Sequence, residues 1–294
     1  MKICITGVNG FLGNYFIEQL LKSGHQVIAT NRGQSKVNFA HENFIYEEMD
    51  FTDAALVNAI LQKHQPAYVI HSGAMSKPDD CEKNKPLADK INIDGTAIML
   101  QAAKAIGAGF LFMSTDFIFD GATGMYTETA TTNPVNYYGE TKVKAEALVT
   151  QYEHNWSIVR TVLVYGKPYN KRNNILTIVR EKLENGESYD VFNDQVRTPT
   201  YAQDLAKAIV SIIEKKATGI YNICGKDVLT PYDMAVATAN YLQLDASLIK
   251  KITAKDFVQP AKRPPITGLD ISKAKNDLGY EPISFEEGLR RTLA

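Results

Sequence analysis

Cysteine, net charge and long apolar runs are all scarce in this 294-residue sequence. The three cysteines are odd in number and far apart, and none has metal-ligand spacing, so neither a disulfide framework nor a metal site is predicted. We expect buried, reduced thiols and a cytoplasmic location. The net charge of -1 gives no reason to expect nucleic acid or a membrane surface as a partner. No run of about 18 apolar residues is present to cross a membrane.

Short apolar segments alternate with helical patterns through the first half of the chain. The predicted strands are 2–6, 27–30, 44–47, 68–71, 110–113 and 157–160, and the predicted helices include 13–23, 89–106 and 137–151. Most of these strands are apolar on both faces, as in a sheet covered by helices on both sides. The alternation predicts an α/β fold, a Rossmann-type doubly wound parallel sheet.

The alternation becomes irregular after about residue 166. We therefore predict a dinucleotide-binding domain over residues 1–165 and a smaller C-terminal substrate-binding region over residues 166–294. The second region is expected to be interleaved with the first, because segments near 192–223 could return to the main sheet. No linker separates the two regions in this prediction.

A glycine-rich loop follows the first predicted strand and opens the first helix. It contains Gly7, Gly10 and Gly13, with Phe11 and Leu12 between the last two. In this spacing the first glycine permits a tight turn and the second lets the backbone approach a pyrophosphate, while the third lets the helix pack close to the sheet. Free N–H groups at the helix start attract phosphates. The loop therefore predicts dinucleotide binding.

The end of the second strand bears on which dinucleotide is bound. An acidic residue there would bind the ribose 2′-hydroxyl of NAD, but this chain has Asn31 and Arg32. Arg32 could pair with a 2′-phosphate and stack on adenine, or it could be a solvated loop residue. We predict NADP, with NAD possible. Asp50 and Phe51, after the third strand, are expected beside the adenine, although Asp50 could instead cap the next helix.

A tyrosine and a lysine four residues apart give the strongest catalytic signal. Tyr138 and Lys142 share one face of a predicted helix. An ammonium beside the phenol would lower the phenol pKa from its usual value of about 10, making Tyr138 a proton donor near neutral pH. Thr115 ends the fifth strand, at the edge that lines the ligand crevice of such sheets, and could hydrogen-bond a substrate oxygen. Together these residues suggest carbonyl reduction.

Four segments resemble the short-chain dehydrogenase/reductase superfamily, specifically its extended, nucleotide-sugar-modifying branch. They are residues 114–121, 126–128, 133–142 and 197–206. Within that branch the chain looks most like the dTDP-4-dehydrorhamnose reductase family, over essentially its whole length. The resemblance implies that Tyr138 protonates a sugar carbonyl as hydride arrives from the nicotinamide. It also implies that Lys142 holds the nicotinamide ribose and that Thr115 orients the carbonyl.

The same resemblance implies a set of substrate contacts and an assembly. The substrate-binding residues would be Asn92, Asp116, Asn174 and Arg197, with Arg197 pairing with the diphosphate. Asn92 could instead be a helix-surface amide, and Arg197 could form a surface salt bridge. The partner is a nucleotide-sugar substrate, and a homodimer would fit the habit of the family.

The implied function is NADPH-dependent reduction of a 4-keto group on a nucleoside-diphosphate deoxysugar. One alternative is a nucleotide-sugar epimerase, which consumes no net NADPH, and Arg197 stands where the rhamnose-pathway reductases often have glycine. A second alternative is a catalytically silent NADP-binding regulatory subunit, because the beta subunit of methionine adenosyltransferase also resembles this family. Phe117 stands where the related 4,6-dehydratases carry the glutamate needed for water elimination, which argues against dehydration.

Overall fold

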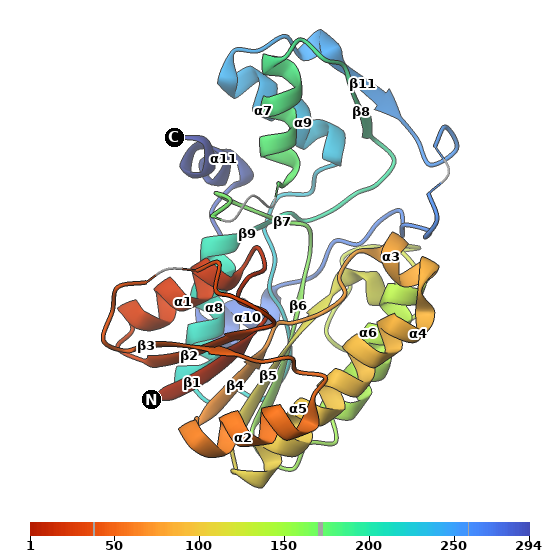
Figure 1. Cartoon of the computed structure of the whole chain (residues 1–294). Coiled ribbons are helices and arrows are strands. Elements are labelled where there is room, and N and C mark those ends of the chain that lie inside the picture. Colours follow the sequence, from red (N-terminus) through yellow and green to blue (C-terminus); the bar gives the residue numbers. More distant parts are fainter. Residues whose placement is uncertain (38, 170–172, 258) are drawn as a thin grey trace.

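The main sheet is built from parallel strands in the order β10-β6-β5-β4-β1-β2-β3 (Figure 1). The structure is a computed structural model that describes residues 1–37, 39–169, 173–257 and 259–294, and within these ranges the sheet has seven strands. They are β1 (Lys2–Thr6), β2 (Gln26–Asn31), β3 (Phe44–Glu48), β4 (Tyr68–His71), β5 (Gly109–Thr115), β6 (Trp156–Thr161) and β10 (Gly219–Asn222). Every residue of β5 is buried, as its continuous apolar sequence predicts. The predicted doubly wound sheet is confirmed.

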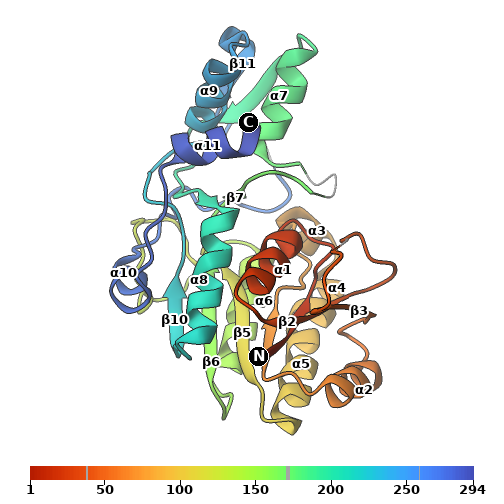
Figure 2. The ribbon, with the colours of Figure 1, turned by 90° about the vertical axis from the view of Figure 1, so that its left-hand side faces the viewer.

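Helices cover both faces of this sheet (Figures 1 and 2). One face carries α1 (Gly13–Lys22), α8 (Ala202–Glu214) and α10 (Ser272–Leu278), and the other carries α2 (Ala54–His64), α5 (Gly95–Ala105) and α6 (Tyr137–Val149). Each layer has its own cluster of buried apolar side chains against the sheet. The chain also returns to the main sheet late in the sequence, since α8 packs against α1 and β10 pairs with β6.

A smaller lobe lies beyond the carboxyl ends of the strands, at the top of Figure 1. It contains α7 (Ile175–Glu184), β8 (Tyr189–Phe192), α9 (Pro231–Leu242), β11 (Ile249–Ile252) and α11 (Phe285–Leu293). Its helices and its small parallel β8–β11 sheet enclose a separate apolar cluster. Two short strands, β7 (Val164–Tyr165) and β9 (Thr200–Tyr201), pair between the lobe and the main sheet.

One predicted helix differs in the structure. The sequence predicts a continuous helix over 89–106, whereas the chain forms α4 (Lys85–Asp89), a π-helical turn η1 (Lys90–Asp94) and then α5. A π turn inserts an extra residue into the helical ladder and is found mostly at functional sites. Gly95 then starts α5 directly against the Phe51 ring, since an added Cβ would lie 2.7 Å from it. No described helix combines the length and the apolar character that crossing a bilayer requires.

Candidate active site

A cleft of about 1290 Å³ opens between the carboxyl ends of the strands and the smaller lobe. This is where ligands bind in open α/β sheets. Residues from both parts of the chain line it. The predicted site residues on its wall are Gly7, Gly10, Phe11, Leu12, Asn31, Arg32, Asp50, Phe51, Thr115, Asp116, Tyr138, Lys142, Asn174 and Arg197. Gly13 and Asn92, which were also predicted, are not among the described lining residues.

The glycine loop leaves no room for side chains. Gly7 has a φ of +76°, and a Cβ added there would lie 2.8 Å from the Gly73 backbone, while one on Gly10 would lie 2.9 Å from Gly7 O. A Cβ on Gly13 would lie 1.8 Å from Val8 O, so Gly13 lets α1 pack against the loop rather than facing the cleft. The result is bare backbone at the start of a helix, which suits a pyrophosphate.

Arg32 and Asp50 face each other at one end of the cleft. Arg32 Nη1 lies 3.9 Å from Asp50 Oδ2, and the arginine side chain is 80% exposed. Burial raises the pKa of the Asp50 carboxyl, but hydrogen bonds from Thr52 and the Arg32 charge more than offset this, so the pKa is lowered overall. Asn31 Oδ1 accepts a hydrogen bond from Asn9 N at 3.4 Å. An exposed, solvated cation therefore stands where the second strand ends.

Phe51 forms part of the cleft floor. Its ring fills the space that side chains on Gly73 and Gly95 would need, with added Cβ atoms at 2.4 and 2.7 Å from ring carbons. The ring also packs edge-on against His71 at a centroid distance of 5.0 Å. The two glycines thus let an aromatic side chain lie between the end of β4 and the start of α5.

Tyr138 is brought to the end of β5 by a close helix contact. Asn136 caps α6 by accepting a hydrogen bond from Gly139 N at 2.9 Å. A Cβ on Gly139 would lie 2.1 Å from Phe117 O, so only glycine lets the first turn of α6 approach the turn after β5. Tyr138 thereby lies near Thr115, which lowers the pKa of the phenol but does not offset the rise caused by burial.

Lys142 lines the cleft but does not act on Tyr138 as predicted. Its Nζ donates to Met113 O at 2.6 Å and lies 3.8 Å from the centre of the Phe112 ring. Burial lowers the pKa of Lys142 to about 7, whereas burial raises the pKa of Tyr138, and Lys142 is not among the groups that shift it. The prediction that Lys142 lowers the pKa of Tyr138 is therefore wrong for this structure. The ammonium points to β5, and the phenol lies in a poorly solvated pocket.

Asn92 lies behind the cleft wall, in the π turn η1. Its Oδ1 accepts from Met75 N at 2.8 Å, and its Nδ2 donates to Met75 O at 3.1 Å and to Thr141 Oγ1 at 2.9 Å. The predicted contact with substrate is thus replaced by a bridge between the loop after β4 and α6. Neither the predicted role nor a helix-surface amide describes this residue, because its side chain is 2% exposed.

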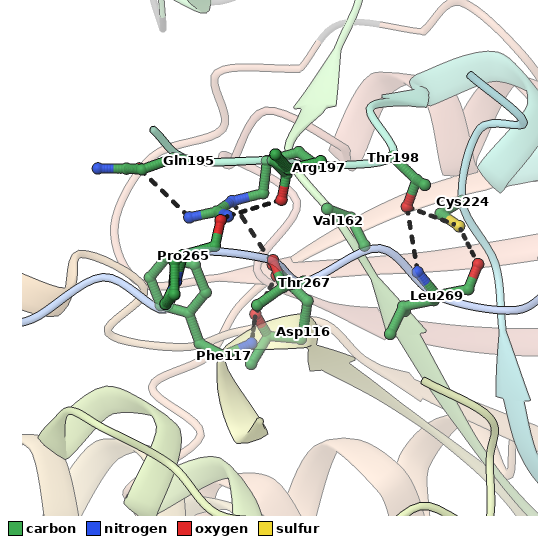
Figure 3. Close-up of polar contacts among 12 residues, drawn as sticks. Asp116, Phe117, Val162, Gln195, Arg197, Thr198, Cys224, Pro265, Thr267 and Leu269 are labelled. Atoms are coloured by element: carbon green, nitrogen blue, oxygen red, sulfur yellow. Dashed lines mark hydrogen bonds and ion pairs between the residues drawn. The ribbon is translucent and has the colours of Figure 1, made fainter. Parts of the chain in front are cut away.

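Asn174 and Arg197 line the cleft, and their polar groups form hydrogen bonds within the protein. Asn174 caps α7, accepting from Leu176 N at 3.0 Å and donating to Gly166 O at 2.6 Å. The Arg197 guanidinium donates to Val196 O, Pro265 O and Gln195 Oε1, and it is 3% exposed. A surface salt bridge is therefore excluded for Arg197, because the residue is buried. Figure 3 shows its contact with Gln195.

Thr6 and His71 support the glycine loop, although the sequence alone did not single them out. Thr6 Oγ1 accepts from Ser72 N and Gly73 N, both at 3.1 Å, and pairs with His71 Nδ1 at 2.8 Å. Burial lowers the pKa of His71 to about 3, so the ring is neutral. Because the hydroxyl already accepts twice, its single proton is directed to His71. Register between β1 and β4, which sequence does not give, creates this contact.

Arg263 and Asp79 connect the two sides of the cleft. Arg263 Nη1 and Nη2 donate to the two carboxylate oxygens of Asp79 at 2.6 and 2.8 Å. Ala261 N also donates to Asp79 at 3.0 Å, and Asn136 Nδ2 donates to Lys262 O at 2.8 Å. Residues 261–263, which lie between β11 and α10 in the sequence, are thus held against α3 (Pro78–Lys83) and the start of α6.

No group of three or more histidine, cysteine or acidic residues in the described ranges is arranged to hold a metal ion. All three cysteines are free and buried. Cys4 and Cys224 have raised thiol pKa values because of burial, as does Cys81. The polar groups on the cleft wall include the Thr115 hydroxyl, the Tyr138 phenol, the Lys142 amine and the Asp116 carboxyl.

A glycine loop and a Tyr–Lys pair facing one cleft of a doubly wound sheet define the extended short-chain dehydrogenase/reductase class. Within it, the chain belongs to the RmlD substrate binding domain family, whose model matches residues 1–294. The match to the whole chain agrees with the resemblance found in the sequence. The fold and family predictions are confirmed.

Similar proteins include both reductases and a subunit of a different enzyme. A dTDP-4-dehydrorhamnose reductase structure from Clostridium acetobutylicum superposes with a TM-score of 0.88 at 30% identity, covering 100% of this chain and 98% of that one. The Bacillus anthracis enzyme in complex with NADP gives 0.85 at 26% identity, covering 99% and 98%. The methionine adenosyltransferase 2 subunit beta of Xenopus tropicalis is 28% identical over 99% of this chain and 87% of its own length.

Proposed function

We propose that this protein reduces a 4-keto group on a nucleoside-diphosphate deoxysugar with NADPH, as a dTDP-4-dehydrorhamnose reductase-like enzyme. The observation that carries the proposal is the placement of Thr115, Tyr138 and Lys142 on the wall of the same cleft as the glycine loop. The two similar reductase structures, one of them with NADP, support the same reading.

The chain's own residues divide the work in this reaction. Bound NADPH supplies the hydride. Tyr138 donates its phenolic proton to the carbonyl oxygen as negative charge develops there, and its raised pKa keeps that proton in place until then. Lys142, buried beside Met113, would offer its ammonium to the nicotinamide ribose. Asp116, Asn174 and Arg197 stand along the wall where the sugar nucleotide would lie.

Arg32 is the residue we assign to NADPH recognition. It is exposed and lies at the end of β2, with Asp50 3.9 Å away, so its guanidinium is available to a 2′-phosphate. The Arg32→Ala variant should raise the Kd for NADPH roughly tenfold or more and leave the Kd for NADH unchanged. Fluorescence titration with both cofactors checks this, and equal weakening of the two would remove Arg32 from this role.

A regulatory role is the main alternative, because the similar subunit beta of methionine adenosyltransferase 2 is named as a subunit of another enzyme. A silent cofactor-binding protein has no need of a catalytic triad of side chains. Here Thr115, Tyr138 and Lys142 are all present and all reach the cleft, which favours catalysis. An epimerase would use the same groups without net NADPH consumption.

The deciding experiment is a panel of nucleotide-linked 4-keto deoxysugars assayed by NADPH oxidation at 340 nm. Stoichiometric oxidation with one member is expected, and Tyr138→Phe should lower kcat by about 100-fold or more while NADPH still binds. Exchange at the sugar without net oxidation would identify an epimerase. Tight NADPH binding with no turnover of any member would favour the regulatory role.

We also propose roles for the two regions of the chain, a cellular location and an assembly. Residues 1–165 would bind the cofactor and residues 166–294 the substrate, since the cleft is lined from both parts of the chain. We propose a cytoplasmic location, which three free thiols fit, and a homodimeric assembly.

A further inference from the structure

Asp116 is a buried acid at the base of the cleft, directly after the predicted substrate-orienting Thr115. It is 3% exposed and starts the short 3-10 turn η2 (Asp116–Ile118) at the end of β5. Figure 3 shows its carboxylate facing Thr267 and Arg197, which come from a part of the chain distant in sequence. A buried carboxylate is costly unless hydrogen bonds and an opposite charge compensate it, so the surroundings of Asp116 require an explanation.

Each carboxylate oxygen of Asp116 has its own partner. Oδ1 accepts the hydroxyl of Thr115 at 3.1 Å, and Oδ2 accepts the hydroxyl of Thr267. Arg197 Nε lies 4.0 Å from Oδ2. Burial raises the pKa of Asp116, and the Arg197 charge and the two hydroxyl donors oppose that rise. The carboxylate is thus held on one side by Arg197 and Thr267 and on the other by Thr115.

The hydrogen bonds of Thr115 leave only one direction for its proton. A hydroxyl has one proton to donate and two lone pairs to accept with. The Thr115 proton is donated to Asp116, and Phe117 N donates to Thr115 Oγ1 at 3.2 Å. The remaining lone pair of Thr115 is left for the Tyr138 phenol, which lines the same cleft and whose pKa Thr115 affects. With its proton committed to Asp116, Thr115 can accept from Tyr138 but cannot donate to it.

We propose that Asp116 is a positioning residue that fixes the direction of the Thr115 hydroxyl proton, with Arg197 and Thr267 holding the carboxylate. It acts through Thr115 and leaves Tyr138 as the group that delivers the proton to a carbonyl oxygen. The inference rests on the proposed function for its catalytic meaning. The hydrogen-bond geometry itself can be tested without any turnover.

The Asp116→Asn variant reverses this arrangement. Arg197 and Thr267 both present hydrogen-bond donors, so the amide oxygen of the new side chain turns toward them. Its NH₂ group then faces Thr115 Oγ1 and donates to it. The hydroxyl now accepts from two N–H groups, and its proton turns toward the phenol of Tyr138. A donor replaces an acceptor beside that phenol, and a negative charge is removed.

Both changes favour the phenolate, so Tyr138 should titrate at lower pH in Asp116→Asn. Besides Asp116, the titratable group that acts on Tyr138 is Cys81 on α3, while Lys142 on the same helix as Tyr138 is held at Met113 O, and neither is altered. The pKa of Arg197, which faces Asp116, is affected by the charges of Arg263 and Asp194, and both of these residues are unchanged in the variant. The expected shift is about one pH unit or more.

The test uses the full-length protein labelled with ¹³C at tyrosine Cζ. The resonance lost in Tyr138→Phe belongs to Tyr138, and it should titrate at lower pH in Asp116→Asn than in the native protein. The Thr267→Val variant removes one hydrogen bond to Asp116 but keeps the Asp116 charge and its contact with Thr115. It should therefore shift the titration of the Tyr138 resonance far less than Asp116→Asn does. When Thr115 is also replaced by valine, the shift in Tyr138 titration that Asp116→Asn causes should be smaller. An unchanged Tyr138 titration in Asp116→Asn overturns the proposal.

A second measurement covers the case in which Asp116→Asn does not fold. Neutron diffraction on the native protein should place deuterium between Thr115 Oγ1 and Asp116 Oδ1, and deuterium directed at Tyr138 would contradict the proposal. If a substrate is found, the alkaline limb of the kcat profile should move to lower pH in Asp116→Asn, in parallel with the Tyr138 resonance. Absence of any turnover by the native protein would count against the proposed function only.

Discussion

Lys142 illustrates at the residue scale how burial sets the chemistry of a side chain. Its ammonium is enclosed between Met113 O and the Phe112 ring, and desolvation lowers its pKa to about 7. The group is therefore poised near neutrality and responds to any charge placed beside it. Tyr138 differs because burial favours its neutral form, which is the form that donates a proton.

NADPH binding should take up a proton at Lys142. Because the pKa of Lys142 in the free protein is about 7, the group is largely neutral at pH 8, and the negative charge of the cofactor favours the ammonium. NADPH affinity should therefore fall as pH rises above 7. Isothermal titration calorimetry at pH 8 in two buffers of different ionisation enthalpy measures this proton uptake.

The matched control for this measurement lies on the same helix. Lys144 is exposed and is not among the described residues that line the cleft. Lys142→Met should abolish the proton uptake, whereas Lys144→Met should leave it unchanged. Equal uptake in the native protein and in Lys142→Met would show that another group titrates on binding.

At the scale of the elements, the position of α6 decides the geometry of the site. Gly139 lets its first turn approach Phe117, and a buried ion pair fixes its last part against β6. In this pair Arg160 Nε and Nη2 donate to Glu146 Oε1 and Oε2 at 3.1 and 2.7 Å, and both side chains are less than a tenth exposed. Arg160 also donates to Glu128 O, so few of its donors lack a partner.

Glu146→Gln should destabilise the protein by roughly 3 kcal/mol, because it leaves the Arg160 charge buried without its counter-charge. Urea unfolding followed by circular dichroism gives the change in unfolding free energy. Glu153→Gln is the control, since Glu153 forms an exposed pair with Lys104 whose loss should leave the urea midpoint unchanged. Similar destabilisation by both variants would mean that the buried ion pair contributes no more to the unfolding free energy than the exposed pair does.

The π turn η1 is a second element whose geometry carries function. The sequence pattern predicts helix through residues 89–106, and local propensity contains no signal for the extra residue of a π turn. The turn directs Asn92 to Met75 and Thr141, which ties the loop after β4 to the catalytic helix. A tertiary hydrogen bond, not a local preference, accounts for this difference between the prediction and the structure.

At the scale of the whole molecule, the sheet and the glycine loop were predictable because their signals are local. Strand length, apolar runs and the Gly7, Gly10 and Gly13 spacing are read within a few residues of one another. The return of α8 and β10 to the sheet was also predicted. Partners far apart in sequence were not predictable, as shown by Arg263 with Asp79 and by Thr267 with Asp116.

The sequence by itself determined the doubly wound fold, the bare backbone of the cofactor loop and the presence of a phenol and an amine one helical turn apart. Each of these depends on the periodicity or size of neighbouring residues. Only the tertiary structure decided where their polar atoms point. It directed Lys142 to Met113, turned Asn92 away from the cleft and gave Asp116 its partners in the smaller lobe. The direction of a hydrogen bond and the pKa of a buried group depend on which distant segments exclude water, and that is settled only when the two parts of the chain pack together.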